Sequence, residues 1–84
     1  MAAEPTGVRN NIRVLRLLHG GMTQQDLADR IGVTRQTVNA IEGGKYSPSL
    51  EVAFRVALAL EVRLEEVFRY EPPVRRAGRH VRLD

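Results

Sequence analysis

Residues 35–40 of this chain bring together an arginine, a glutamine and an asparagine with a threonine and an alanine, namely Arg35, Gln36, Asn39, Thr37 and Ala40. Arginine, glutamine and asparagine carry donors and acceptors that match the edges of guanine and adenine in the major groove. The alanine could contact only a thymine methyl group, so base recognition is expected mainly near the beginning of the segment. Packing alone gives no obvious reason for these residue types, and we interpret them as a candidate DNA-contacting surface.

The residues around this surface predict two short helices joined by a tight turn. Thr23 is a predicted N-cap, and Asp26 can reach back to its amide in a variant of the capping box. Thr34 is a second predicted N-cap. Gly32 lies between the two helices, where glycine can adopt the positive φ that normally ends a helix. The second helix, over residues 34–42, would carry the candidate surface on its outer side.

The apolar residues of these two helices fall on their inner faces. They are Leu27, Ala28 and Ile31 in the first of the pair, and Val38 and Ile41 in the second. Helical spacing places each set on one side of its helix. Ala28 is small enough to let two steeply crossing helices approach each other. We therefore expect the pair to pack through these faces and to leave Arg35 and its neighbours exposed.

Three further helices are predicted from apolar residues at helical spacing: Ile12, Leu15 and Leu18; Leu50, Phe54, Ala57 and Leu60; and Leu64, Val67 and Phe68. The first of them is expected to end near Gly20 and Gly21. The segment 47–49 offers an N-cap and a proline at or near the first turn of the fourth helix. No strand-like alternation is convincing before the last residues. The expected fold is all-α, with four or five helices around a core in which Phe54 and Phe68 are the largest members.

The same residues resemble the phage-repressor and Cro-like (XRE-type) helix-turn-helix regulators. The matching positions are Gln24, Ala28, Gly32 and Val38, with Leu27, Ile31 and Ile41 as the apolar residues between and beyond them. The flanking segments 22–25 and 41–50 extend the match, which runs from about Asn10 to Tyr70. The resemblance implies a compact lambda-repressor-like domain with its helix-turn-helix at the second and third helices, and double-stranded DNA as the partner.

The resemblance also implies roles for individual residues. The base-contacting residues would be Arg35, Gln36, Thr37, Asn39 and Ala40, with Arg35 directed at guanine and Gln36 at adenine. The DNA-backbone contacts would be Thr23, Gln24, Thr34, Gly43, Gly44, Lys45 and Tyr46. Arg16 and Glu42 would form an ion pair that bridges the first and third helices.

The chain departs from the family pattern at two places. Two glycines precede Met22 where relatives commonly have one. At the junction of the fourth and fifth helices, relatives have a glycine and then a serine or threonine, where this chain has Glu61 and Arg63. The first replacement would remove the residue that favours a left-handed helix end, and the second would remove the N-cap of the next helix. Each would lower the free energy of unfolding by about 1 kcal/mol.

Composition limits the other possibilities. The 84 residues suffice for one small domain, and the net charge of +3 suits an acidic partner. The chain has no cysteine, which excludes disulfides and thiolate metal sites. No nucleophile–base set, metal-ligand spacing or phosphate-binding glycine loop is evident, so we expect no enzyme activity, metal or cofactor. With no signal peptide or membrane-spanning stretch visible, a cytoplasmic protein is expected.

The predicted organisation has three parts: a flexible N-terminal segment at 1–8, the DNA-binding domain at 9–70, and a basic tail at 71–84. Prolines 72 and 73 would end helical structure. The tail has three possible roles: a mobile basic end, an arm that contacts phosphates or the minor groove, or a strand over 80–84 that pairs with its counterpart in a dimer.

Two functional hypotheses follow from these features. The first is a sequence-specific transcription regulator, a repressor that binds a palindromic operator as a homodimer. The second is an antitoxin-type protein that binds a partner toxin and regulates its own operon through the same motif. No clear toxin-binding segment is visible, which favours the first hypothesis.

Overall fold

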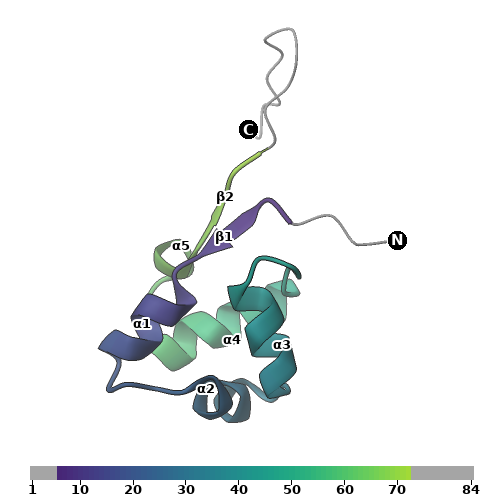
Figure 1. Ribbon diagram of the computed structural model, residues 1–84. Helices are drawn as coiled ribbons and strands as arrows, with labels where there is room; N and C mark the ends of the chain where they lie inside the picture. The colour runs from purple at the N-terminus through teal and green to yellow at the C-terminus, as the bar shows by residue number, and fades with distance from the viewer. Residues whose placement is uncertain (1–5, 73–84) are drawn as a thin grey trace, which may run out of the picture.

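The computed structural model describes residues 6–72, which form five helices and two short strands. In chain order these are β1 (Val8–Asn10), α1 (Ile12–Leu18), α2 (Gln24–Ile31), α3 (Arg35–Glu42), α4 (Leu50–Leu60), α5 (Leu64–Val67) and β2 (Phe68–Tyr70) (Figure 1). The five predicted helices are confirmed, with α2 and α3 joined by a short turn. None of the helices within residues 6–72 is long and apolar enough to span a membrane.

The two strands are not predicted by the sequence pattern. β1 and β2 pair antiparallel, with Asn10 opposite Phe68 and Val8 opposite Tyr70. Figure 1 shows this ladder beside α1 and α5, where it joins the two ends of the helical domain. Strands of three residues are too short to produce a recognisable alternation of side chains. Val8, predicted to belong to the N-terminal segment, is instead the first residue of β1.

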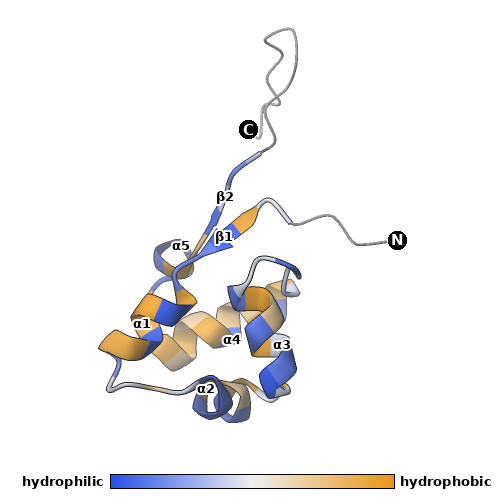
Figure 2. Ribbon diagram, in the orientation of Figure 1, coloured by the Kyte–Doolittle hydropathy of each residue, from blue (hydrophilic) through white to orange (hydrophobic). Residues whose placement is uncertain are grey.

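The core lies where the inner faces of the helices meet. Its fully buried larger side chains are Ile12, Leu27, Ile31, Ile41, Val38, Val56 and Val67. The predicted inner faces of α2 and α3 are confirmed, because all five of their apolar residues are buried. Figure 2 shows that α4 is the most hydrophobic of the helices, and it packs against α2 and α5.

The predicted faces of α1 and α4 are partly wrong. On α1, Ile12 is buried as predicted, but Leu18 is 77% exposed and the second buried residue is Arg16. On α4, Leu50 and Phe54 are exposed, and Ala53 and Val56 are buried instead. Because α4 is apolar at most positions, periodicity could not identify its inner face. Phe54 is therefore not a core residue, and Phe68 is only half-buried.

The junction between α4 and α5 forms a left-handed helix end although this chain lacks the glycine and the serine or threonine that the resemblance leads us to expect there. Glu61 adopts a left-handed conformation with φ 59°, the only non-glycine residue of segment 6–72 to do so. Arg63 precedes α5, and its side chain cannot accept a hydrogen bond from the helix. The Glu66 carboxylate instead accepts from the Arg63 backbone N–H at 2.8 Å. This hydrogen bond lowers the pKa of Glu66.

Candidate nucleic-acid interface

The beginning of α2 is defined by a reciprocal capping box. The Thr23 hydroxyl oxygen accepts from the Asp26 backbone N–H at 2.9 Å, and Asp26 Oδ2 accepts from the Thr23 N–H at 3.1 Å. The bond from the Thr23 backbone, followed by that from its side chain, lowers the pKa of the Asp26 carboxyl group. The predicted N-cap at Thr23 is confirmed.

The turn between α2 and α3 depends on Gly32. Its φ is 76°, and its N–H donates to the Ala28 carbonyl at 2.9 Å. Thr34 then caps α3, with its hydroxyl accepting from the Thr37 N–H at 3.2 Å. The two threonine hydroxyls also lie 3.0 Å apart, so the hydroxyl of Thr37 is already engaged at the cap. This turn places α3 across the end of α2 (Figure 1).

The outer side of α3 carries the predicted base-contacting residues. Arg35, Gln36 and Asn39 are exposed, while Thr37 and Ala40 are half-buried. Within residues 6–72, the side chains of Arg35 and Gln36 have no hydrogen-bond or ion-pair partner. Their donors and acceptors are therefore free to contact a ligand.

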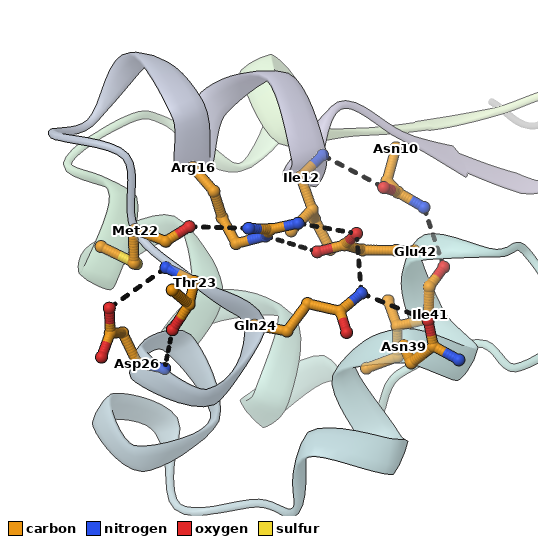
Figure 3. Close-up of polar contacts among 10 residues, drawn as sticks. All are labelled: Asn10, Ile12, Arg16, Met22, Thr23, Gln24, Asp26, Asn39, Ile41 and Glu42. Carbon is orange, nitrogen blue, oxygen red and sulfur yellow. Dashed lines mark hydrogen bonds and ion pairs between the residues drawn. The ribbon is translucent and has the colours of Figure 1, made fainter.

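An ion pair holds the opposite end of α3 (Figure 3). Arg16 Nε donates to Glu42 Oε2 at 2.6 Å, and Arg16 Nη2 donates to Oε1 at 3.2 Å. Arg16 Nη1 donates to the Met22 carbonyl at 2.6 Å. Each of the paired side chains is only 9% exposed. Arg16 thus joins three segments: α1, the residue Met22 before α2, and the end of α3. The ion pair between the first and third helices is the one that the family resemblance implied.

Gln24 takes part in the same network instead of projecting freely. Its side-chain amide donates to Asn39 Oδ1 and to Glu42 Oε1, each at 3.2 Å. Figure 3 shows this amide lying between the two acceptors. The contact orients the Asn39 side chain, because its amide oxygen Oδ1 accepts the hydrogen bond from Gln24. For the predicted phosphate contact, the backbone N–H of Gln24 in the first turn of α2 is the available donor.

Asn10 is a further positioning residue, and the sequence pattern did not reveal it. Its Nδ2 donates to the Ile41 carbonyl at 2.9 Å, and its Oδ1 accepts from the Ile12 N–H at 3.1 Å. Asn10 thereby connects the beginning of α1 with the end of α3 (Figure 3). The available signal was an asparagine just before a predicted helix, but its partner on α3 could not be identified from sequence.

The loop after α3 differs from the expected backbone-contact segment. The N–H groups of Gly43, Gly44 and Lys45 donate to carbonyls of Asn39, Ile41 and Ala40, each at 3.0 Å. Their amides are therefore occupied and do not point freely at a ligand. The ammonium group of Lys45 and the half-exposed ring of Tyr46 are the groups of this loop that remain available.

Comparison with known proteins agrees with this geometry. The helix-turn-helix family model (HTH_3) matches residues 12–67. The chain belongs to this helix-turn-helix family. An uncharacterised HTH-type transcriptional regulator of Methanocaldococcus jannaschii is 48% identical over 64 residues, covering 76% of this chain and 96% of its own. The uncharacterised HTH-type regulator YgzD of Bacillus subtilis is 43% identical over 61 residues, covering 73% and 91%.

Solved structures show the same arrangement of helices. A putative DNA-binding protein from Bacteroides fragilis superposes with a TM-score of 0.65 at 27% identity, over 74% of this chain and 98% of its own. The restriction-modification controller protein C.AhdI from Aeromonas hydrophila has a TM-score of 0.61 at 33% identity, over 66% and 82%. As in the family, α2 and α3 form the helix-turn-helix of this protein.

In the part of the chain that the structure describes, no cluster of three histidine, cysteine, aspartate or glutamate side chains could hold a metal ion. The polar groups of the site instead form two sets. One set is internally bonded and positions α3; the other, at the beginning and outer side of α3, is exposed. This division suits a rigid surface that binds a polar macromolecule.

Proposed function

We propose that the protein is a sequence-specific, double-stranded-DNA-binding transcription regulator whose helix α3 enters the major groove. The observation that carries this proposal is the exposure of Arg35 and Gln36, without internal partners, on a helix that three other segments hold in place. The similar proteins bear names of transcriptional regulators or DNA-binding proteins, which supports the same conclusion.

Each group on this surface has a proposed role. Arg35 and Gln36 recognise base edges, with support from Thr37, Asn39 and Ala40 along the same helix. The first turns of α2 and α3, at Thr23, Gln24 and Thr34, face phosphates, because helix N-termini favour anions. Lys45 and Tyr46 lie in the loop of residues 43–46, after the C-terminal end of α3. They add contacts to the DNA backbone at that end of the helix.

We further propose that the protein acts as a cytoplasmic repressor and as a homodimer. A single module of this kind covers about 600–1,000 Å² of protein surface on DNA, which is less than specific complexes generally use. Two copies on half-sites about 10 bp apart would double the contacts and match a palindromic operator. A dimer that occupies an operator can block transcription without enzymatic activity or a cofactor. The names of the relatives described above, which are transcriptional regulators and DNA-binding proteins, support the regulator rather than the antitoxin alternative.

The experiment is a pair of substitutions measured on an operator obtained by binding-site selection with the purified protein. Arg35→Ala and Gln36→Ala should each weaken operator binding by about 1–3 kcal/mol, the usual value of a bidentate base contact, and should barely change binding to random DNA. Gln25→Ala is the matched control, since Gln25 is exposed on α2 and, within residues 6–72, its side chain bonds only to Asp29. If both α3 variants bind the operator as the wild type does, the assignment of base contacts is wrong.

A further inference from the structure

A series of hydrogen bonds leads from the buried ion pair to Asn39 on the outer side of α3. Arg16 donates to both carboxylate oxygens of Glu42. Nε2 of Gln24 donates to Glu42 Oε1 and to Asn39 Oδ1, each at 3.2 Å. The exposed Asn39 is therefore the last member of a chain of polar contacts that begins at a pair of side chains only 9% exposed (Figure 3).

The chemistry of this series determines which end of each amide group faces its neighbour. The Arg16 guanidinium group can only donate, and the Glu42 carboxylate can only accept. The NH₂ group of Gln24 must therefore face Glu42, because two oxygens could not form a hydrogen bond. An NH₂ group also only donates, so the atom of Asn39 that lies next to it must be the oxygen. The buried charges thus impose the orientation of the Asn39 amide.

The end of Asn39 that remains available is a donor. Its Oδ1 faces Gln24 on α2, and its Nδ2, which has no bonded partner in the described segment 6–72, lies on the side away from Gln24 (Figure 3). An asparagine that binds adenine in the major groove uses both groups, with its oxygen accepting from N6 and its nitrogen donating to N7. Asn39 cannot present both groups to one base while its oxygen faces α2.

We propose that Asn39 is a specificity-determining residue that selects guanine instead of adenine, and that Gln24 is the residue that positions it. The proposal rests on the proposed function and specifies the base at one position of the operator. Guanine presents two neighbouring acceptors in the major groove, N7 and O6, and these suit an NH₂ group that only donates. Adenine places a donor beside N7, cytosine presents a donor, and thymine has one acceptor beside its methyl group. Guanine therefore matches the available end of Asn39 best.

The neighbour of Asn39 on the same face of α3 has the same preference. Arg35 precedes Asn39 by four residues, so the two side chains lie one turn apart on one side of the helix. The Arg35 guanidinium group also only donates, and guanine is its usual base partner. This face of α3 therefore offers donors at both positions, and each half-site should contain a guanine for each of these two side chains.

The first step of the test is binding-site selection with the full chain and with Asn39→Ala. The base pair at which the alanine variant loses its preference is the one that Asn39 contacts. At this pair the wild type should bind G·C about 10-fold more tightly than A·T, as expected for one good base contact. A wild-type preference for A·T at this pair, or an alanine variant that retains every preference, would overturn the proposal.

The second step uses Gln24→Met, which changes the orientation of Asn39 without removing it. Methionine has a similar length and helix propensity but no amide, so Asn39 Oδ1 is released and the side chain can turn to bind adenine. The preference for G·C over A·T at the identified pair should therefore be lost, while the preference at the pair contacted by Arg35 should remain. Glu42 keeps both of its bonds to Arg16, so the variant should fold, as circular dichroism would show.

Gln25→Met is the matched control for the second step. Gln25 is the next residue of α2, is exposed, and bonds through its side chain only to Asp29 in the part of the chain that the structure describes. This variant should retain the wild-type preference at every pair. An unchanged preference for G·C in Gln24→Met, or an equal loss in Gln25→Met, would overturn the proposal alone. Failure of the wild type to bind any duplex would instead overturn the proposed function.

Discussion

At the scale of single residues, the Arg16–Glu42 pair explains how a charged side chain can occupy a core position of α1. An arginine buried without a partner would carry a large desolvation penalty. Here Nε, Nη1 and Nη2 of Arg16 each donate a hydrogen bond to a carboxylate or carbonyl oxygen. The pair joins helices that are distant in sequence. Its geometry therefore fixes the orientation of α3 relative to α1.

We expect Glu42→Gln to destabilise the domain by about 3 kcal/mol, because it leaves the buried Arg16 guanidinium without a counter-charge. Urea denaturation followed by circular dichroism measures this difference. Glu51→Gln is the control: Glu51 pairs with Arg55 on the surface, and its loss should cost less than about 0.5 kcal/mol. Equal effects of the two substitutions would contradict the role assigned to the buried pair.

The capping carboxylate of Asp26 makes a pH-dependent contribution to stability. Its pKa in the folded protein lies below the ordinary value of 3.8, chiefly because it accepts a hydrogen bond from the Thr23 backbone. A depressed folded-state pKa means that the stabilisation is complete above the unfolded-state pKa and is lost as the pH falls through the folded-state pKa.

Asp26→Asn removes this titrating carboxylate. As the pH is lowered from about 5, the unfolding free energy of the variant should therefore fall less than that of the wild type. Urea titrations of both proteins across this range measure the difference, and carbon NMR of the Asp26 carboxyl group reports its pKa directly. Identical pH profiles for the variant and the wild type would show that the capping box contributes nothing through this charge.

At the scale of elements, α4 ends in a strained backbone conformation at Glu61, which the folded domain maintains. Glu61 keeps the left-handed conformation that glycine would adopt without strain. Its carboxylate lies 3.0 Å from His19 Nε2 at the end of α1, but the Glu61 side chain is 76% exposed and the His19 side chain is partly exposed. A screened surface contact of this kind contributes little to stability, so the backbone strain should dominate.

We therefore predict that Glu61→Gly raises the free energy of unfolding by about 1 kcal/mol, since a left-handed conformation costs roughly 1–2 kcal/mol for a residue with a side chain. Glu61→Gln separates the two effects, because it removes the charge near His19 and keeps the strain. Chemical denaturation of the three proteins gives the comparison. A glycine variant no more stable than the glutamine variant would show that this position is not strained.

At the scale of the whole molecule, the β1–β2 ladder closes the domain by pairing residues near both of its ends. The Asn11 N–H also donates to the Val67 carbonyl at 2.9 Å, and Asn10 reaches the end of α3. The beginning of the domain is thus tied both to α5 and to the helix that we propose enters the groove. The closed domain carries one candidate DNA-contacting surface. Two copies of the protein would therefore be needed to contact both half-sites of a palindromic operator.

The corresponding prediction concerns assembly on DNA. Sedimentation should show two protomers bound to each operator, and footprinting should show two symmetric half-sites about 10 bp apart. An operator cut to a single half-site should bind much more weakly, because half of the contacts are lost. A single protomer bound tightly to one asymmetric site would contradict the proposed homodimer.

The amino-acid sequence by itself determined the helix-turn-helix: its caps at Thr23 and Thr34, its turn at Gly32 and the exposure of Arg35 and Gln36. These features depend on hydrogen bonds and side-chain periodicity between residues a few positions apart, so a local pattern suffices to predict them.

Only the tertiary structure decided which face of α4 is buried, how Gln24 is used, that Asn10 holds the end of α3, and that β1 pairs with β2. Each of these outcomes depends on contacts between segments far apart in the chain. The local pattern was compatible with several such contacts: α4 is apolar on most sides, and an asparagine or glutamine amide can bond to many partners. Packing of the complete domain selects among them, because it alone determines which apolar faces meet and which polar groups must be satisfied.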